Sequence, residues 1–262
     1  MIRRELKYNF KNFLIWTLVA CCMYMVIFLI YPSLFDAEQV DINGMLKAFP
    51  EDMLKAFNMD INGIDNAYGW LKSEGFVFLL MIIGCYGGLL GSSILLKEES
   101  EQTIEYLATL PISRTAIVLQ KSVVGVFYII AITLVVSGSN YVGLLLSGEF
   151  DKKQYLLLSV TPLFSSLVLF FLCLFLSTFA KKTRKVLGIT LGLVFASYLL
   201  NMLAGISDKA EVFKYFSAFT LADIRNVMLD GKINPVMVGI SILISALCLG
   251  LTVFRYNRKE LV

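Results

Sequence analysis

The sequence has no histidine among its 262 residues, which removes the commonest general base and the commonest metal ligand of proteins. Its five cysteines all lie inside apolar runs, and none forms the CxxC pair that is typical of zinc or redox sites. We therefore expect neither a disulfide framework nor a metal site, and we interpret the cysteines as small buried apolar side chains.

Charge is also missing where the chain is most apolar. No Asp, Glu, Lys or Arg lies within the six longest apolar stretches, apart from Lys121 at the very edge of the third, where its side chain can snorkel to the membrane surface. Because ion-coupled transporters usually need ionisable groups inside the membrane, this absence argues against a proton- or cation-driven carrier. The net charge of +3 is too small to indicate nucleic-acid binding.

A phosphate-binding loop is absent as well. Such a loop needs the pattern G-x-x-x-x-G-K-[ST], because its backbone amides cradle the phosphates. The only Gly-Lys pair is Gly231-Lys232, which is followed by Ile233 and has Asn226 in place of the first glycine. We therefore expect no ATP hydrolysis by this chain, and no catalytic residues of its own.

Apolar residues are abundant, at 58% of the chain, and the mean hydropathy is +0.75. Six stretches of about 19–25 residues are each long enough to cross a hydrocarbon core of roughly 30 Å. The predicted fold is an all-α integral membrane protein, a single transmembrane domain over residues 1–262, with no cleaved signal peptide. Its spans are predicted at 13–31, 76–96, 122–146, 155–179, 186–206 and 235–254.

The distribution of Lys and Arg between the spans predicts the orientation. One side carries 14 basic and 6 acidic residues, and the other carries 9 basic and 14 acidic residues. Because basic residues collect in the cytoplasm, the first side is predicted to be cytoplasmic. It consists of the N-terminus, 97–121, 181–185 and 255–262, so both termini lie inside.

Three segments outside the spans are amphipathic. Residues 2–11 are predicted to form a helix on the inner membrane surface, or alternatively a plain basic flank of the first span. The outer loop 32–75 is predicted to contain one or two amphipathic helices on the outer surface. The segment 207–234 is predicted to dip back into the outer leaflet, with phenylalanines as anchors.

Glycine pairs mark faces on which helices approach closely. The second span contains Gly84/Gly88 and Gly87/Gly91, and the fifth contains Gly188/Gly192. Because glycine has no side chain, GxxxG faces predict tight packing within the subunit or between two copies.

The segment between spans two and three departs from the basic trend of its side. Four glutamates crowd its first half, and a short helix is predicted over residues 98–109, which Pro111 ends. Ser113 is predicted to cap the following helix. A solvated loop whose charges happen to be acidic is the alternative interpretation.

The run from Glu98 to Arg114 resembles the signature E-x-x-x-G-T-x-E-x-L-L-x-x-P-[VI]-S-R of bacterial type-two ABC transporter permeases. Thr103, Glu105 and the Pro111-Ile112-Ser113-Arg114 run match it. Gln102 stands where the family usually has glycine, which bears on how sharply the backbone bends there. The amphipathic N-terminus, the six spans, the long first outer loop and the inside termini are similar to that family as well.

The resemblance implies that residues 98–109 are the cytoplasmic coupling helix, which sits in a groove of a separate ATPase subunit. It also implies an exporter in the bacterial cell membrane, in which two ATPase copies with ATP and Mg join a dimer of this chain with itself or a paralogue. The implied contacts with the ATPase are Glu98, Glu99, Glu101, Thr103, Glu105, Tyr106 and Arg114, with Arg3 and Glu5 as a second contact. This chain would bind no cofactor.

The substrate is inferred from the composition of the spans, which suits a hydrophobic or amphipathic cargo such as a peptide, a drug or a lipid-like molecule. Residues proposed for its path are Asn140, Asn201, Phe164 and Tyr198, although each can instead face lipid or a neighbouring helix. A non-transporting immunity or sensor protein that uses the same type of ATPase is the main alternative. An intramembrane enzyme is disfavoured, because the serines of the spans have no evident partner base.

Overall fold

A computed structural model describes residues 1–35, 67–103, 112–180, 182–206, 208–222, 224, 227–228 and 231–259. Within these ranges the chain is helical and contains no strand. The predicted outer-surface helices of loop 32–75 fall mainly on residues 36–66 and so lie outside the described part.

In the described part of the chain, six long helices are apolar enough to cross a membrane, and this confirms the predicted fold class. Five of them are longer than the predicted spans, because helical structure continues into the polar flanks, whereas the second, Phe76–Ile94, ends two residues before the predicted span 76–96 does. Their bounds are α1 Ile2–Phe35, α5 Phe76–Ile94, α8 Arg114–Ser147, α9 Lys152–Ser177, α10 Thr183–Ile206 and α12 Pro235–Arg258.

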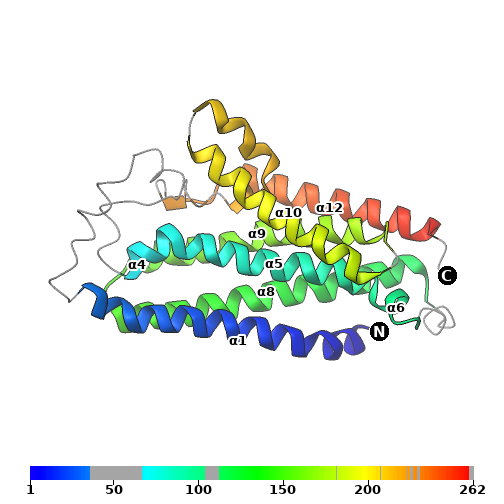
Figure 1. Cartoon of the computed structure of the whole chain (residues 1–262), viewed down its shortest axis with the longest axis horizontal. Helices are drawn as coiled ribbons and strands as arrows, with labels where there is room; N and C mark the ends of the chain where they lie inside the picture. Colours follow the sequence, from blue (N-terminus) through cyan, green and yellow to red (C-terminus); the bar gives the residue numbers. More distant parts are fainter. Residues whose placement is uncertain are drawn as a thin grey trace.

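The helices lie side by side along the long axis of the molecule (Figure 1). Helices α5 and α9 form the centre, with α1 and α8 packed on one side of them and α10 and α12 on the other. Both termini lie at one end of the bundle, together with the short helix α6 (Lys97–Ser100). We call this end the terminal end and the other the opposite end.

Local signals place the helix starts. Ser113 has an extended backbone, and its side chain accepts a hydrogen bond from the Ala116 N–H at 3.2 Å, which confirms the predicted cap of α8. Asp151 caps α9 in the same way. Asn234 caps α12, and Pro235 follows at the first helical position, where its missing N–H costs nothing.

The N-terminal segment does not form a helix of its own, so the predicted separate surface helix over residues 2–11 is wrong. Instead α1 runs unbroken for 34 residues, about 50 Å at 1.5 Å per residue. The sequence explains this, because residues 2–31 contain neither glycine nor proline. Since a hydrocarbon core is only about 30 Å thick, part of α1 extends beyond it.

Glycines bring α5 and α9 into close contact, which confirms the predicted tight packing of the second span. A Cβ atom on Gly91 would lie 2.3 Å from the backbone oxygen of Phe170, and one on Gly87 would lie 3.0 Å from that of Ser166. Gly188 and Gly192 of α10 have open space around them, so no such contact forms there within the described chain.

At the opposite end, α4 (Ala67–Trp70) and a π-helical turn, η1 (Leu71–Gly75), lead directly into α5. After α10 the chain turns back in two short 3₁₀ helices, η2 (Asp208–Phe216) and η3 (Ala218–Ala222), while their position in the outer leaflet stays a prediction. Phe219 of η3 is buried against Gly84, whereas Phe213 and Phe216 of η2 are exposed. Only η3 therefore enters the bundle.

Candidate functional site

The segment that carries the acidic residues follows α5 at the terminal end. Helix α6 ends at Ser100, so the helix predicted over 98–109 is not continuous. The chain turns at residues 101–103, and residues 104–111 lie outside the described ranges. Any coupling helix in this segment therefore begins beyond Thr103.

The turn after α6 is a Schellman motif, in which a left-handed residue closes the helix. The Thr103 N–H donates to the Glu98 carbonyl at 2.8 Å, and the Gln102 N–H donates to the Glu99 carbonyl at 3.4 Å. Gln102 has a φ of 57°, and it is the one non-glycine residue with a positive φ in the described ranges. The backbone thus takes the bend that glycine would favour, although the side chain is glutamine.

A cluster of four charges is buried under α6. Lys97 Nζ lies 2.5 Å from Glu5 Oε2, and Lys121 Nζ lies 2.5 Å from Glu98 Oε2. Lys121 also lies 3.8 Å from Glu5 Oε1 and donates to the Ile94 carbonyl at 2.5 Å. The side chains of Glu5 and Lys121 are 0% exposed. Two acids and two bases therefore balance one another and join α1, α6 and α8.

This cluster corrects the expectation that Lys121 snorkels to the membrane surface. Its ammonium group instead points into the protein, because two carboxylates and a carbonyl oxygen replace its hydration. The sequence did not lead us to predict that Glu5 pairs with Lys97 and that Glu98 pairs with Lys121. The available signal was that a lone cation at the edge of an apolar span requires a partner, and the acids beside it in the sequence were candidates.

A second set of contacts ties the other face of α6 to the C-terminal part of the chain. Lys259 Nζ lies 2.8 Å and 2.9 Å from the two oxygens of Glu99, and donates to the Ala180 carbonyl at 2.7 Å. Arg114, at the start of α8, donates to the Lys259 carbonyl at 2.6 Å. The C-terminal end of α12 is therefore held to α6, to α8 and to the chain after α9.

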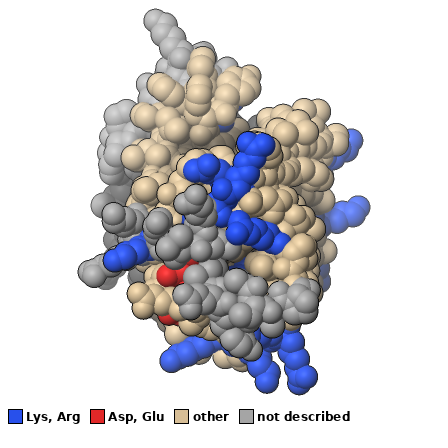
Figure 2. Space-filling view, turned by 90° about the vertical axis from the view of Figure 1, so that its right-hand side faces the viewer, with Lys and Arg blue, Asp and Glu red and all other residues tan. Residues whose placement is uncertain are grey.

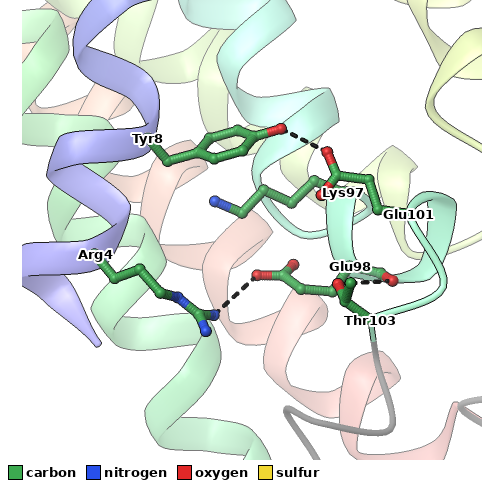
Figure 3. Close-up of a pocket in the computed structure, with 6 residues that line it drawn as sticks. All are labelled: Arg4, Tyr8, Lys97, Glu98, Glu101 and Thr103. Carbon is green, nitrogen blue, oxygen red and sulfur yellow. Dashed lines mark hydrogen bonds and ion pairs between the residues drawn. The ribbon is translucent and has the colours of Figure 1, made fainter.

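Between α1 and α6 lies an open pocket of about 250 Å³, which we call the α1–α6 pocket. Figure 3 shows Arg4 and Tyr8 projecting from α1 toward Glu98 and Glu101. The Tyr8 hydroxyl donates to Glu101 Oε1 at 2.6 Å, and Arg4 Nη2 lies 3.6 Å from Glu98 Oε1. Its lining residues are Arg4, Tyr8, Lys97, Glu98, Glu101 and Thr103.

The predicted ATPase contacts fall into two groups. Glu98, Glu99 and Glu5 have side chains that are 6%, 5% and 0% exposed, so they hold the chain together rather than present charge at the surface. The exposed members are Arg3, Glu101, Thr103 and Arg114, while Glu105 and Tyr106 lie outside the described ranges.

The residues predicted for a substrate path are not brought together. Asn140 lies on α8, Phe164 on α9, and Asn201 and Tyr198 on α10, and the layer of α5 and α9 separates α8 from α10. Asn140 is 1% exposed, and neither its amide oxygen nor its amide nitrogen has a hydrogen-bond partner. Asn201 accepts a hydrogen bond from Thr220 at 3.3 Å. In the part of the chain that the structure describes, no group of His, Cys, Asp or Glu side chains could hold a metal ion.

Comparison with known proteins assigns the family. The sequence model of a family described as ABC-2 family transporter protein matches residues 2–261, nearly the whole chain. No curated relative matches the sequence. With six helices of membrane-spanning length and composition, the chain belongs to the ABC-2 family of transporter proteins, as a multi-pass permease component that associates with a separate ABC ATPase subunit.

Proposed function

We propose that this permease is the membrane half of an exporter that moves a hydrophobic or amphipathic substrate, such as a peptide, a drug or a lipid-like molecule, out of the cell. Two copies of the ATPase subunit bind and hydrolyse ATP with Mg, and a second permease copy or a paralogue completes the membrane part. The observation that carries the proposal is the anchoring of α6 on two faces, because it links the acidic segment to α1, α8 and α12.

The anchoring supports a mechanism in which the ATPase moves several helices at once. The contact segment after Thr103 follows the ATPase as it closes on ATP, and α6 moves with that segment. If α6 moved alone, Lys97 and Glu5 would separate and leave buried charges unpaired, which costs about 3–5 kcal/mol. Moving α1 and α8 together with α6 avoids this cost, so these three helices rock as one body.

The surface of the terminal end supports the proposed orientation. Figure 2 shows Lys and Arg side chains spread over this face, with little acidic surface visible between them. The acids Glu5 and Glu98 are buried beneath, whereas basic residues such as Lys7 and Arg255 are exposed. An outward-facing basic surface is typical of the cytoplasmic side of a membrane protein and supports cytoplasmic termini.

The substrate class is supported by the apolar character of the spans. Only 17% of the most apolar window of α12 and 22% of that of α10 is buried within the chain, so these helices present apolar surface to lipid, to a second permease or to cargo. The unpartnered amide of Asn140 offers a polar contact once α8 separates from its neighbours. A pathway with apolar walls and few polar groups suits an amphipathic molecule better than a bare ion.

Co-purification with the ATPase encoded beside this permease tests the partnership. Wild type is expected to retain the ATPase, and reversing Glu101 and Glu105 together to lysine is expected to release it. The control is Glu149→Lys, since Glu149 is exposed at the opposite end. If both variants retain the ATPase equally, the acidic segment is not part of the contact with it.

Transport is tested in inside-out vesicles that contain both subunits. A fluorescent amphipathic peptide or lipid is expected to accumulate inside with ATP, and not when the ATPase is inactivated. If the complex forms and hydrolyses ATP but none of a panel of such substrates moves, the export proposal fails. The non-transporting sensor or immunity function then becomes the better account.

A further inference from the structure

The α1–α6 pocket contains a carboxylate oxygen without a hydrogen bond. Glu98 Oε1 is buried, lines the pocket and has no hydrogen-bond donor. Arg4 Nη2 forms an ion pair with this oxygen at 3.6 Å, which is beyond hydrogen-bonding distance, and the Arg4 side chain is 49% exposed. The other oxygen of the same carboxylate is paired with Lys121. A buried acceptor that lacks a donor is costly, so this oxygen favours an incoming donor.

The donors around the pocket are already engaged elsewhere. Lys97 binds Glu5 and lies over the Tyr8 ring, 3.9 Å from its centre. The Tyr8 hydroxyl donates to Glu101, and the Thr103 hydroxyl donates to the Glu98 backbone carbonyl at 3.4 Å. Arg4 is half exposed, and its contact in the pocket is the long ion pair with Glu98 at 3.6 Å.

Hydrogen-bond acceptors, in contrast, remain available in the pocket. Glu98 has a free oxygen, and the exposed carboxylate of Glu101 accepts from Tyr8 and has lone pairs for further donors. The lining also carries two cations, but Lys97 is paired with Glu5 and Arg4 is half exposed, so the two carboxylates on one wall favour a cationic occupant over an anionic one. A guanidinium or ammonium group has several donors and no acceptor, and therefore matches what the pocket lacks.

We propose that the α1–α6 pocket receives an arginine or lysine side chain of the ATPase subunit, whose head group donates to Glu98 Oε1 and Glu101. The inference rests on the proposed partnership with the ATPase and names a contact within it. The volume of about 250 Å³ has room for one long side chain, and the pocket is open to the surface. The contact joins the partner to α1 as well as to the acidic segment.

This proposal predicts the sign of one mutational effect. Arg4 is the cation that an incoming cation would meet, so removing its charge strengthens binding of the ATPase. If the pocket instead takes an anion, Arg4 is its anchor, and the same change weakens binding. Arg4→Met is compared with Lys7→Met, which removes an exposed positive charge one turn along α1 outside the pocket.

The experiment measures the affinity of the purified ATPase for the permease in nanodiscs at low and high salt. Arg4→Met is expected to lower Kd about 3–10-fold at low salt, and the gain should shrink at high salt. Thr103→Lys, which supplies a cation to the pocket from within the chain, is expected to raise Kd by about tenfold or more. Lys7→Met should change Kd less than about twofold. Thermal unfolding of each variant shows whether it is folded.

The outcomes separate this inference from the proposed function. If wild type binds the ATPase but Arg4→Met weakens binding or leaves it unchanged, the basic side chain in the pocket is ruled out and the partnership stands. If wild type binds no ATPase, the partnership fails and the inference fails with it. A photocrosslinking residue in place of Tyr8 provides a second measurement, and it should capture an ATPase peptide that contains arginine or lysine. Crosslinks confined to this chain would overturn the inference.

Discussion

The two ends of the bundle are held together by different chemistry. At the terminal end, three lysines and three glutamates form buried or nearly buried ion pairs around α6. At the opposite end, neutral groups make most of the contacts. Gln154 is the centre there, since it accepts from Tyr68 at 3.1 Å and from Lys72 at 3.4 Å and donates to the Met228 carbonyl at 2.9 Å.

Aromatic rings complete the opposite end. The ring centre of Phe150 lies within 6 Å of the ring centres of Tyr68, Tyr141 and Tyr155. The Tyr24 hydroxyl donates a hydrogen bond to the Gly75 carbonyl at 2.6 Å. Ring contacts allow offset and tilted arrangements of similar energy, so they tolerate small displacements. Buried ion pairs do not, because separating them strands a desolvated charge. The terminal end is therefore built to keep its helices in register, and the opposite end is better able to adjust.

The largest expected effect comes from Lys121→Met, which strands Glu98 in the buried cluster. We expect a loss of about 3–5 kcal/mol in the free energy of unfolding. Lys11→Met, at an exposed position of α1, should stay within about 0.5 kcal/mol. The measurement is denaturant unfolding in detergent micelles. Partial recovery in Lys121→Met/Glu98→Gln would confirm that the stranded charge is the cause, and an unchanged midpoint of Lys121→Met would contradict the cluster.

Lys259→Met should have the next largest effect, because it removes both hydrogen bonds to Glu99 and the one to the Ala180 carbonyl. We expect a loss of about 2 kcal/mol, as for a hydrogen-bonded charge that is only partly solvated. The control is Lys182→Met, at an exposed position. Hydrogen exchange should also rise in residues 97–103. No change in exchange there would show that α12 does not hold α6.

Gln154→Leu tests the opposite end, where it removes one acceptor and one donor from the hydrogen-bonded group. We expect a loss of about 1–2 kcal/mol, smaller than that for Lys121→Met, since no buried ion is stranded. Lys153→Gln, one residue away and exposed, should be near neutral. A loss as large as that for Lys121→Met would remove the distinction between the two ends.

Gln102→Gly is expected to have the smallest effect of these variants, and it is the one expected to increase the free energy of unfolding. A left-handed conformation costs a non-glycine residue roughly 1–2 kcal/mol, and glycine offsets part of this by its own entropy, so we expect a gain of about 0.5–1 kcal/mol. The control is the same substitution at Gln120 within α8, which should destabilise by about 1 kcal/mol. Opposite signs at the two positions support the Schellman turn, and equal losses contradict it.

Several features could be predicted because their causes are local. The cap at Ser113 depends on a side chain and an amide three residues away, and the close contact of α5 depends on glycines that repeat every four residues. The bend at Gln102 was left open by the sequence, because glutamine stands where the family usually has glycine, and the structure shows that the backbone bends there nonetheless. The helix predicted over 98–109 failed because hydrophobic spacing gave no sign that this turn stops it.

The lysine partners of Glu5 and Glu99 could not be predicted from spacing along the chain. Glu5 and Lys97 are 92 positions apart, and Lys259 and Glu99 are 160 positions apart, yet each pair is in hydrogen-bonding contact. Sequence reasoning therefore placed Glu5, Glu98 and Glu99 at a surface for a partner, whereas they bind within the chain. Among the glutamates of the predicted contact that the structure describes, Glu101, one turn further, is the one that remains exposed.

By itself the sequence determined that the protein crosses the membrane six times, because a stretch of about 20 apolar residues has no other stable place. It also predicted that ATP hydrolysis is supplied by another chain, since the phosphate-binding pattern is missing, and the match to the ABC-2 family of membrane components agrees with this. Only the tertiary structure decided which charges neutralise one another and which remain free. Electrostatic pairing depends on distances of a few ångströms between residues far apart in the chain, and those distances exist only once the helices have packed.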